Sequence, residues 1–128
     1  MTSVIMRSSI SASVVAKVQG GFYVLTGLWP VAHMRSFTAV TGPKTDLWLV
    51  QAFGMLIAAI GAVLLLVGLR RKVDVPTLLF GIATALTLAF IDVWFFLRGA
   101  ISAVYLADAA AELVLALSWG WVWRRSPR

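Results

Sequence analysis

The sequence predicts an all-α fold: a four-helix transmembrane bundle with up-down-up-down topology, built as one membrane domain from residues 1–128. Three observations lead to this prediction. Hydrophobic residues make up 61% of the chain and charged residues 12%, with a mean hydropathy of +0.94. In soluble domains, about 45–50% of the residues are apolar and about 25% are charged. The apolar residues gather in four runs long enough to cross a bilayer. Basic and aromatic residues stand at the ends of these runs, as they do at a membrane surface.

The first span, at about residues 14–33, is the most polar of the four. Its polar and small residues follow a helical spacing and share one face: Gln19, Tyr23, Thr26, Gly27, Pro30 and His33. Such a face either packs against another helix through small groups or lines a cavity. Residues 1–13 are expected to form a retained tail, because no apolar core of a signal peptide precedes the small residues at positions 11–13.

The second span, at about residues 47–69, contains a stripe of small residues: Gly54, Ala58, Gly61, Ala62 and Gly68. Small residues allow a neighbouring helix to approach closely, so we expect this span to pack through Gly54, Ala58 and Ala62, or through the adjacent Gly61. A Gly-Pro turn precedes the span. Thr45 or Asp46 is expected to cap its first turn.

The third and fourth spans, at about residues 77–97 and 103–123, contain the acids of the membrane region. The third follows a basic turn and has Asp92 near its far end, ahead of an aromatic girdle. The fourth contains Asp108 and Glu112. It closes with tryptophans and arginines, which we interpret as an interfacial anchor: Trp119, Trp121, Trp123, Arg124 and Arg125.

Basic residues are distributed unevenly between the two ends of the predicted bundle. Eight fall on the side of the termini: Arg7, Lys17, Arg70, Arg71, Lys72, Arg124, Arg125 and Arg128. Three fall in the opposite loops: Arg35, Lys44 and Arg98. This bias predicts that both termini are cytoplasmic. The basic residues behind the +6 charge are therefore expected to set the topology and contact anionic lipid. We expect no nucleic acid as a partner.

The three intramembrane acids are the main candidates for function. Asp108 and Glu112 are four residues apart and share a helical face with Tyr105, and Asp92 lies at a similar depth. Each acid would cost about 2.5–3.5 kcal/mol in mid-membrane, so all three are expected to point into the outer half of the bundle. Candidate ligand-binding or proton-coupling residues are therefore Asp108, Glu112, Asp92, Tyr105, His33 and Gln51. The alternative is a structural hydrogen-bonded knot that holds the helices together.

Several kinds of chemistry have no support in the sequence. There is no cysteine, which excludes disulfides, thiolate catalysis and cysteine-ligated metals. His33 is the single histidine, so two-histidine haem and histidine-cluster metal sites cannot form within one chain. No P-loop, nucleophile motif or dinucleotide fingerprint is present. We therefore expect no metal and no cofactor, and no catalytic residue is identified.

The run GLWPVAHMRSFTAVTGPKTDLWLV, from Gly27 to Val50, resembles a segment of small uncharacterised bacterial four-helix inner-membrane proteins. The resemblance implies a bacterial inner (plasma) membrane location and brings no activity with it. The four-span layout is also similar to that of DoxX-like and sterol-isomerase-like (EXPERA) bundles. In the EXPERA bundles, intramembrane acids and aromatic rings surround a cationic lipid intermediate. No motif here transfers residue roles from these families.

Three functions fit these observations. The first is a binding or transport pocket for an amphiphilic or cationic small molecule or lipid, opening toward the outer side. The second is an accessory or structural subunit of a larger membrane complex, in which the acids are structural. The third is an EXPERA-like membrane isomerase that uses Glu112 or Asp108 as acid and base. The lipid bilayer is the expected environment, and a homodimer or a larger complex is a candidate assembly.

Overall fold

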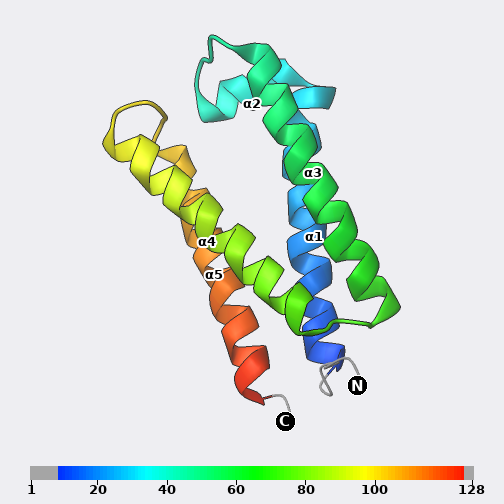
Figure 1. The fold of residues 1–128 in the computed structure, drawn as a ribbon. Coiled ribbons are helices and arrows are strands. Elements are labelled where there is room, and N and C mark those ends of the chain that lie inside the picture. Colours follow the sequence, from blue (N-terminus) through cyan, green and yellow to red (C-terminus); the bar gives the residue numbers. More distant parts are fainter. Residues whose placement is uncertain (1–8, 126–128) are drawn as a thin grey trace.

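The computed structural model describes residues 9–125, which form five α-helices (Figure 1). Their bounds are α1 (Ser9–Ala32), α2 (Met34–Thr41), α3 (Leu47–Arg70), α4 (Val75–Leu97) and α5 (Val104–Arg125). No strand occurs within this part of the chain, so the all-α prediction is confirmed. The short helix α2 stands where the sequence analysis expected only a polar connection. Of the predicted tail, residues 1–8 lie outside the described region, and residues 9–13 belong to α1.

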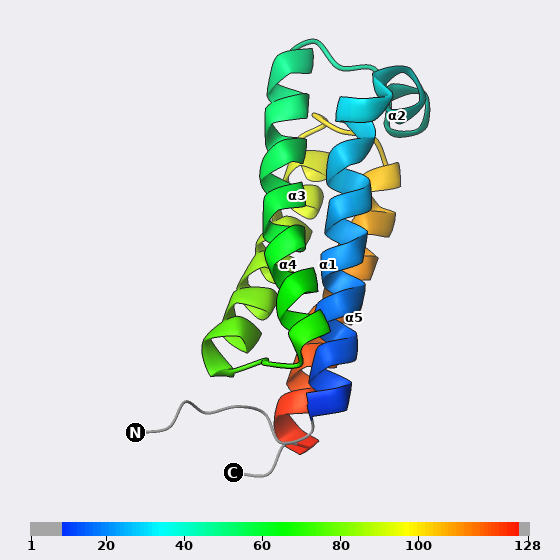
Figure 2. The ribbon, with the colours of Figure 1, turned by 90° about the vertical axis from the view of Figure 1, so that its right-hand side faces the viewer.

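Three helices, rather than the four predicted, are long and apolar enough to cross a membrane: α3, α4 and α5. Helix α1 is as long as α3, with 24 residues, but Lys17, Gln19 and Tyr23 lower its hydropathy. Figure 2 shows that α1 runs beside α3 over most of its length. Gln19 and Tyr23 are buried and bonded to α4 and α5, which a count based on hydropathy alone does not register.

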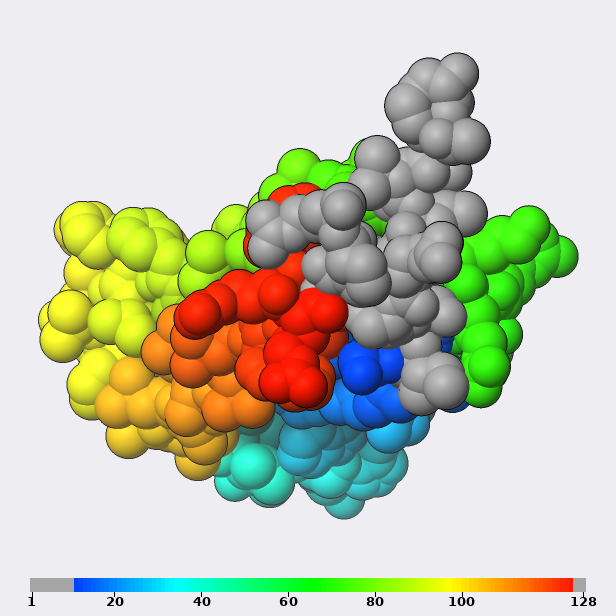
Figure 3. Space-filling view, turned by 90° about the horizontal axis from the view of Figure 1, so that it is seen from below, coloured from blue at the N-terminus to red at the C-terminus, as the bar shows by residue number. Residues whose placement is uncertain are grey.

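The long helices form two pairs, α1 with α3 and α4 with α5. The pairs meet at one end and diverge toward the other, where α2 lies (Figure 1). We call the end where the pairs meet the basic end. It contains the last turn of α5 and the α3–α4 turn with Arg70, Arg71 and Lys72. Viewed from that end, the last turns of α5 (red) lie next to the start of α1 (blue) (Figure 3). The opposite end, with α2 and the α4–α5 connection, is the α2 end.

Helices α1 and α3 touch backbone to backbone through glycines at seven-residue spacings, namely Gly20 and Gly27 on α1 and Gly54, Gly61 and Gly68 on α3. A Cβ atom at Gly20 would lie only 2.5 Å from the Leu65 backbone nitrogen and 2.6 Å from the Gly61 carbonyl oxygen. No larger side chain fits at that separation. The predicted stripe of small residues on α3 is confirmed for these glycines and for the buried Ala58, but it is wrong for Ala62, which is exposed.

Two small apolar clusters join the helix pairs. One lies toward the basic end and contains Ala12, Ala16, Val73, Leu78, Trp119 and Val122. The second contains Tyr23, Leu64, Ala85 and Leu115. Outside these clusters many large apolar side chains remain uncovered, among them Leu25, Leu97 and Leu117, which are 73–75% exposed. An apolar surface this extensive is typical of a protein that lies in lipid.

Side chains cap two of the helices. The Asp74 carboxylate accepts hydrogen bonds from the Thr77 hydroxyl at 2.7 Å and the Thr77 backbone nitrogen at 3.0 Å, and these bonds hold the pKa of Asp74 below its usual value. His33 caps α2 by accepting from the Ser36 backbone nitrogen at 3.2 Å. Asp46 stands at the start of α3, but its side chain makes no capping bond, so the predicted cap is wrong for Asp46.

Neighbouring glycines on α1 offer a matched test of the close helix contact. Gly20→Ala should lower the free energy of unfolding by about 1–3 kcal/mol, because the new methyl group would clash with the α3 backbone. At Gly21 a Cβ atom would have no other atom within 4 Å, so Gly21→Ala should raise stability by about 0.5–1 kcal/mol through helix propensity. Thermal unfolding in detergent measures both. Equal effects of the two substitutions would contradict the packing described here.

Candidate functional site

A chain of buried hydrogen bonds connects the two helix pairs. Glu112 accepts a hydrogen bond from the Tyr23 hydroxyl at 2.6 Å. The Gln19 amide nitrogen lies 3.0 Å from the Tyr23 hydroxyl and 3.1 Å from the Thr84 hydroxyl, and the Trp119 indole donates to the Gln19 amide oxygen at 2.6 Å. We call these five side chains the polar spine: Gln19, Tyr23, Thr84, Glu112 and Trp119.

Helical spacing brings the members of the polar spine together. Gln19 and Tyr23 are one turn apart on α1, and Glu112 and Trp119 are two turns apart on α5, so each pair shares a face. Gly81 on α4 makes room for the indole, because a Cβ atom there would lie 2.5 Å from the Trp119 ring nitrogen. The Gly81 carbonyl oxygen also accepts from the Gln19 amide at 3.0 Å. Helix α1 is thereby tied to α4 and α5 at once.

The other two acids lie nearer to the α2 end than the polar spine does. Asp92 is only 5% exposed, and its Oδ2 atom is buried without a hydrogen-bond partner. Asp108 is half-buried and interacts electrostatically with both Asp92 and Glu112. We call Asp92, Asp108 and Glu112 the acid cluster. Across residues 9–125, no lysine or arginine is paired with any of these three carboxyl groups.

Of the remaining sequence-predicted candidates, His33 and Gln51 lie apart from the acid cluster. His33 is exposed and serves as the cap of α2. Gln51 donates to the Pro30 carbonyl oxygen at 3.4 Å, and so links α3 to α1. Tyr105 lies one turn from Asp108 on α5, with the Lys44 ammonium 5.2 Å from its ring centre. Of these three residues, Tyr105 is therefore the one near the acids.

Sequence reasoning missed the roles of Gln19, Thr84 and Trp119 in the site. Trp119 was interpreted as an interfacial anchor, but it is fully buried, so that interpretation is wrong for this tryptophan. A usable signal existed, because Trp119 shares the helical face of Glu112 and Gln19 shares that of Tyr23. The partnership between the two faces could not be inferred, since it depends on which helices become neighbours.

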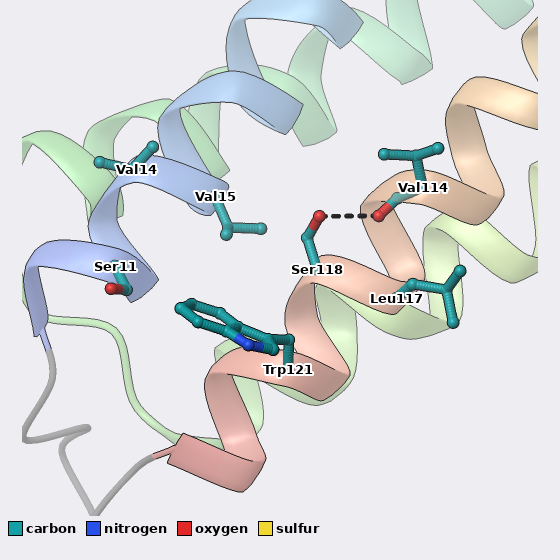
Figure 4. A pocket seen from close by; sticks show the side chains of 7 residues that line it. All are labelled: Ser11, Val14, Val15, Val114, Leu117, Ser118 and Trp121. Atoms are coloured by element: carbon teal, nitrogen blue, oxygen red, sulfur yellow. Dashed lines mark hydrogen bonds between the residues drawn. The ribbon is translucent and has the colours of Figure 1, made fainter.

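The described residues offer no preformed metal site, and two grooves lie away from the acids. No group of three His, Asp or Glu side chains between residues 9 and 125 is arranged to hold a metal ion. One groove, of about 520 Å³, lies between α1 and α5 and is lined by valines, Leu117, Trp121 and two serines (Figure 4). A second, of about 290 Å³, lies between α4 and α5. Neither groove is lined by a member of the acid cluster.

Comparison with protein-family models, with curated proteins and with solved structures found no match for this chain. The suggested resemblance to small bacterial four-helix inner-membrane proteins and to DoxX-like and EXPERA-like bundles therefore stays a prediction.

Removing one hydroxyl from the polar spine tests its contribution to stability. Tyr23→Phe should lower the free energy of unfolding by about 1–3 kcal/mol, because it removes the hydrogen-bond donor to the buried Glu112 carboxyl group. Tyr105→Phe is the matched control, since its ring faces the Lys44 ammonium and its hydroxyl makes no hydrogen bond among the described residues. Thermal unfolding in detergent measures both variants. A Tyr23→Phe protein as stable as the control would refute a stabilising spine.

Proposed function

We propose that this chain is an integral protein of the bacterial inner membrane that binds a lipophilic organic cation at the acid cluster, in competition with protons. The observation behind the proposal is the buried, unpartnered Oδ2 atom of Asp92 beside Asp108. This atom lies in a helix that is long and apolar enough to cross a membrane. An acid in such surroundings needs a positive partner, either a bound proton or a cation.

The positive partner must come from outside the described chain, because no lysine or arginine between residues 9 and 125 pairs with the three acids. Lys44, whose ammonium lies 5.2 Å from the Tyr105 ring centre, is held by other groups. Its ammonium donates to the Thr41 and Gly42 carbonyl oxygens at 3.3 and 3.0 Å. Among the described residues the three acids do not form the multi-oxygen arrangement that a divalent metal requires. An organic cation or a proton remains as the species that these carboxyl groups would hold.

Access from the α2 end is favoured by the position of Asp108. This residue is half-buried and lies about 6 Å along α5 from its first residue, Val104. In the opposite direction, the buried Glu112 and Trp119 of the polar spine close the space between the pairs. A ligand would thus meet Asp108 first and Asp92 next.

The membrane topology follows from the same arrangement and is also our proposal. Helix α1 packs along α3 and would cross the bilayer with it, its polar face covered by α4 and α5. The start of α1, the α3–α4 turn and the last turn of α5 share the basic end. Because lysine and arginine are enriched in cytoplasmic loops, we infer that the basic end is cytoplasmic and the α2 end faces outward.

A pair of fusions tests this topology. Alkaline phosphatase, which is active only outside the cytoplasm, should be inactive when fused after Arg128 and active when inserted after Lys44 in the α2–α3 connection. A fluorescent protein that matures only in the cytoplasm should give the reverse pattern. Phosphatase activity after Arg128 would contradict a cytoplasmic basic end.

A direct binding experiment tests the proposed site. The full-length protein in detergent is titrated with tetraphenylphosphonium, a lipophilic cation. Asp108→Asn should raise the Kd about tenfold or more, because one lost contact between a charge and a carboxylate costs about 1.5 kcal/mol or more. In the unmodified protein, binding should weaken as the pH falls, since protons and the probe compete for the same carboxyl groups.

Asp46→Asn is the matched control, because this acid is exposed at the start of α3. Its Kd should equal that of the unmodified protein. Two results would overturn the proposal: tetraphenylphosphonium binding that Asp108→Asn leaves unchanged at every pH, or no binding by a folded protein. The second result, together with a protein that co-purifies in defined stoichiometry, would favour the accessory-subunit alternative. The EXPERA-like isomerase alternative stays a prediction.

A further inference from the structure

The groove between α1 and α5 lies toward the basic end, away from the acid cluster. Val14 and Val15 of α1 form one wall, and Val114 and Leu117 of α5 form the other (Figure 4). The ring of Trp121 lies at the end nearest the last turn of α5. Of these side chains, Val14, Val114, Leu117 and Trp121 are 48–73% exposed. The groove is therefore an open, apolar channel on the side of the bundle.

The walls of the groove present few polar groups. The Ser118 hydroxyl donates to the Val114 carbonyl oxygen at 2.7 Å, so it is already satisfied (Figure 4). The length of the groove along α5, from Val114 to Trp121, is about 10 Å. A channel of this length and chemistry fits a hydrocarbon chain that runs roughly parallel to the helices.

Positive charge lies at one end of the groove only. The Arg125 guanidinium is 5.3 Å from the centre of the Trp121 ring, and Arg124 is its neighbour. Helix α1 contains no acid, and the last acid of α5 is Glu112, more than three turns before Arg125. Neither arginine is paired with a carboxylate among residues 9–125. Along one face of α5 the order is therefore apolar wall, aromatic ring and unpaired cation.

We propose that this groove binds one anionic phospholipid at the basic end of the bundle. An acyl chain occupies the channel between α1 and α5, the glycerol region lies at the level of Trp121, and Arg125 with Arg124 binds the phosphate-containing headgroup. Tryptophan favours the headgroup level of a bilayer, and arginines near the surface attract anionic lipid. The proposal does not depend on the acid cluster, because the two sites share no residue.

Lipid retention can be measured on the purified full-length protein. The delipidated protein in detergent is incubated with an equimolar mixture of phosphatidylglycerol and phosphatidylcholine, and bound lipid is counted by native mass spectrometry. The unmodified protein should retain one phosphatidylglycerol, preferred about fivefold or more over phosphatidylcholine. Replacing both Arg124 and Arg125 by glutamine should abolish this preference. Val114→Trp, which fills the channel, should abolish retention of either lipid.

Two controls match these variants. Leu113→Trp places the same bulk on an exposed α5 position that does not line the groove, and it should leave lipid retention unchanged. Replacing Arg70 and Lys72 by glutamine removes the same charge from the α3–α4 turn, and it should leave the preference intact. Equal retention of the two lipids by the unmodified protein would overturn the proposal. So would retention that survives Val114→Trp, or a preference lost equally in the Arg70 and Lys72 variant.

Discussion

The hydrogen bond from Tyr23 to Glu112 is the interaction on which the arrangement of the bundle depends. The α1–α3 pair and the α4–α5 pair each have extensive internal contact, but few backbone contacts join one pair to the other. Across that junction the polar spine supplies directional contacts from α1 to both α4 and α5. A buried polar group that loses its partner costs more than an apolar contact of similar size. The spine therefore fixes how the two pairs meet.

Helix α1 can serve this purpose because its two faces have different chemistry. One face presents Gly20 and Gly27 to the α3 backbone, so that α3 covers it closely. The other presents Gln19 and Tyr23 to α4 and α5. The glycine face and the polar face of α1 are thus both covered by neighbouring helices, while apolar side chains such as Leu25 remain exposed. Helix packing in a membrane depends on close backbone approach and on hydrogen bonds. The glycine face of α1 provides the close approach, and its polar face provides the hydrogen bonds.

The all-α fold and the approximate positions of the long helices could be predicted because they follow from local pattern. The second span, predicted at residues 47–69, is α3 at Leu47–Arg70. The short helix α2 was not predicted, since its cap comes from a histidine, a residue seldom used to start a helix. The sequence predicted four apolar spans, but only three helices among the described residues are apolar enough. The remaining predicted span is α1, which is long enough to cross a membrane but contains polar side chains that lower its hydropathy.

The candidate site was predictable only in part. That Asp108 and Glu112 share a face follows from their spacing, and the cost of acids in lipid predicts that such groups turn inward. The burial of Trp119 could not be foreseen, because its indole fits only where Gly81, on another helix, has no side chain. His33 and Gln51 were candidates by polarity and depth, yet His33 caps α2 and Gln51 bonds to the α1 backbone. Polarity alone does not distinguish a cap from a site.

A double-mutant cycle on Tyr23 and Glu112 tests the central claim most directly. The free energies of unfolding are measured in detergent for the unmodified protein, Tyr23→Phe, Glu112→Gln and the double variant. If the hydrogen bond joins the helix pairs as described, the coupling energy between the two residues should be about 1–3 kcal/mol. Strictly additive losses would show that the two side chains act independently and would contradict the account.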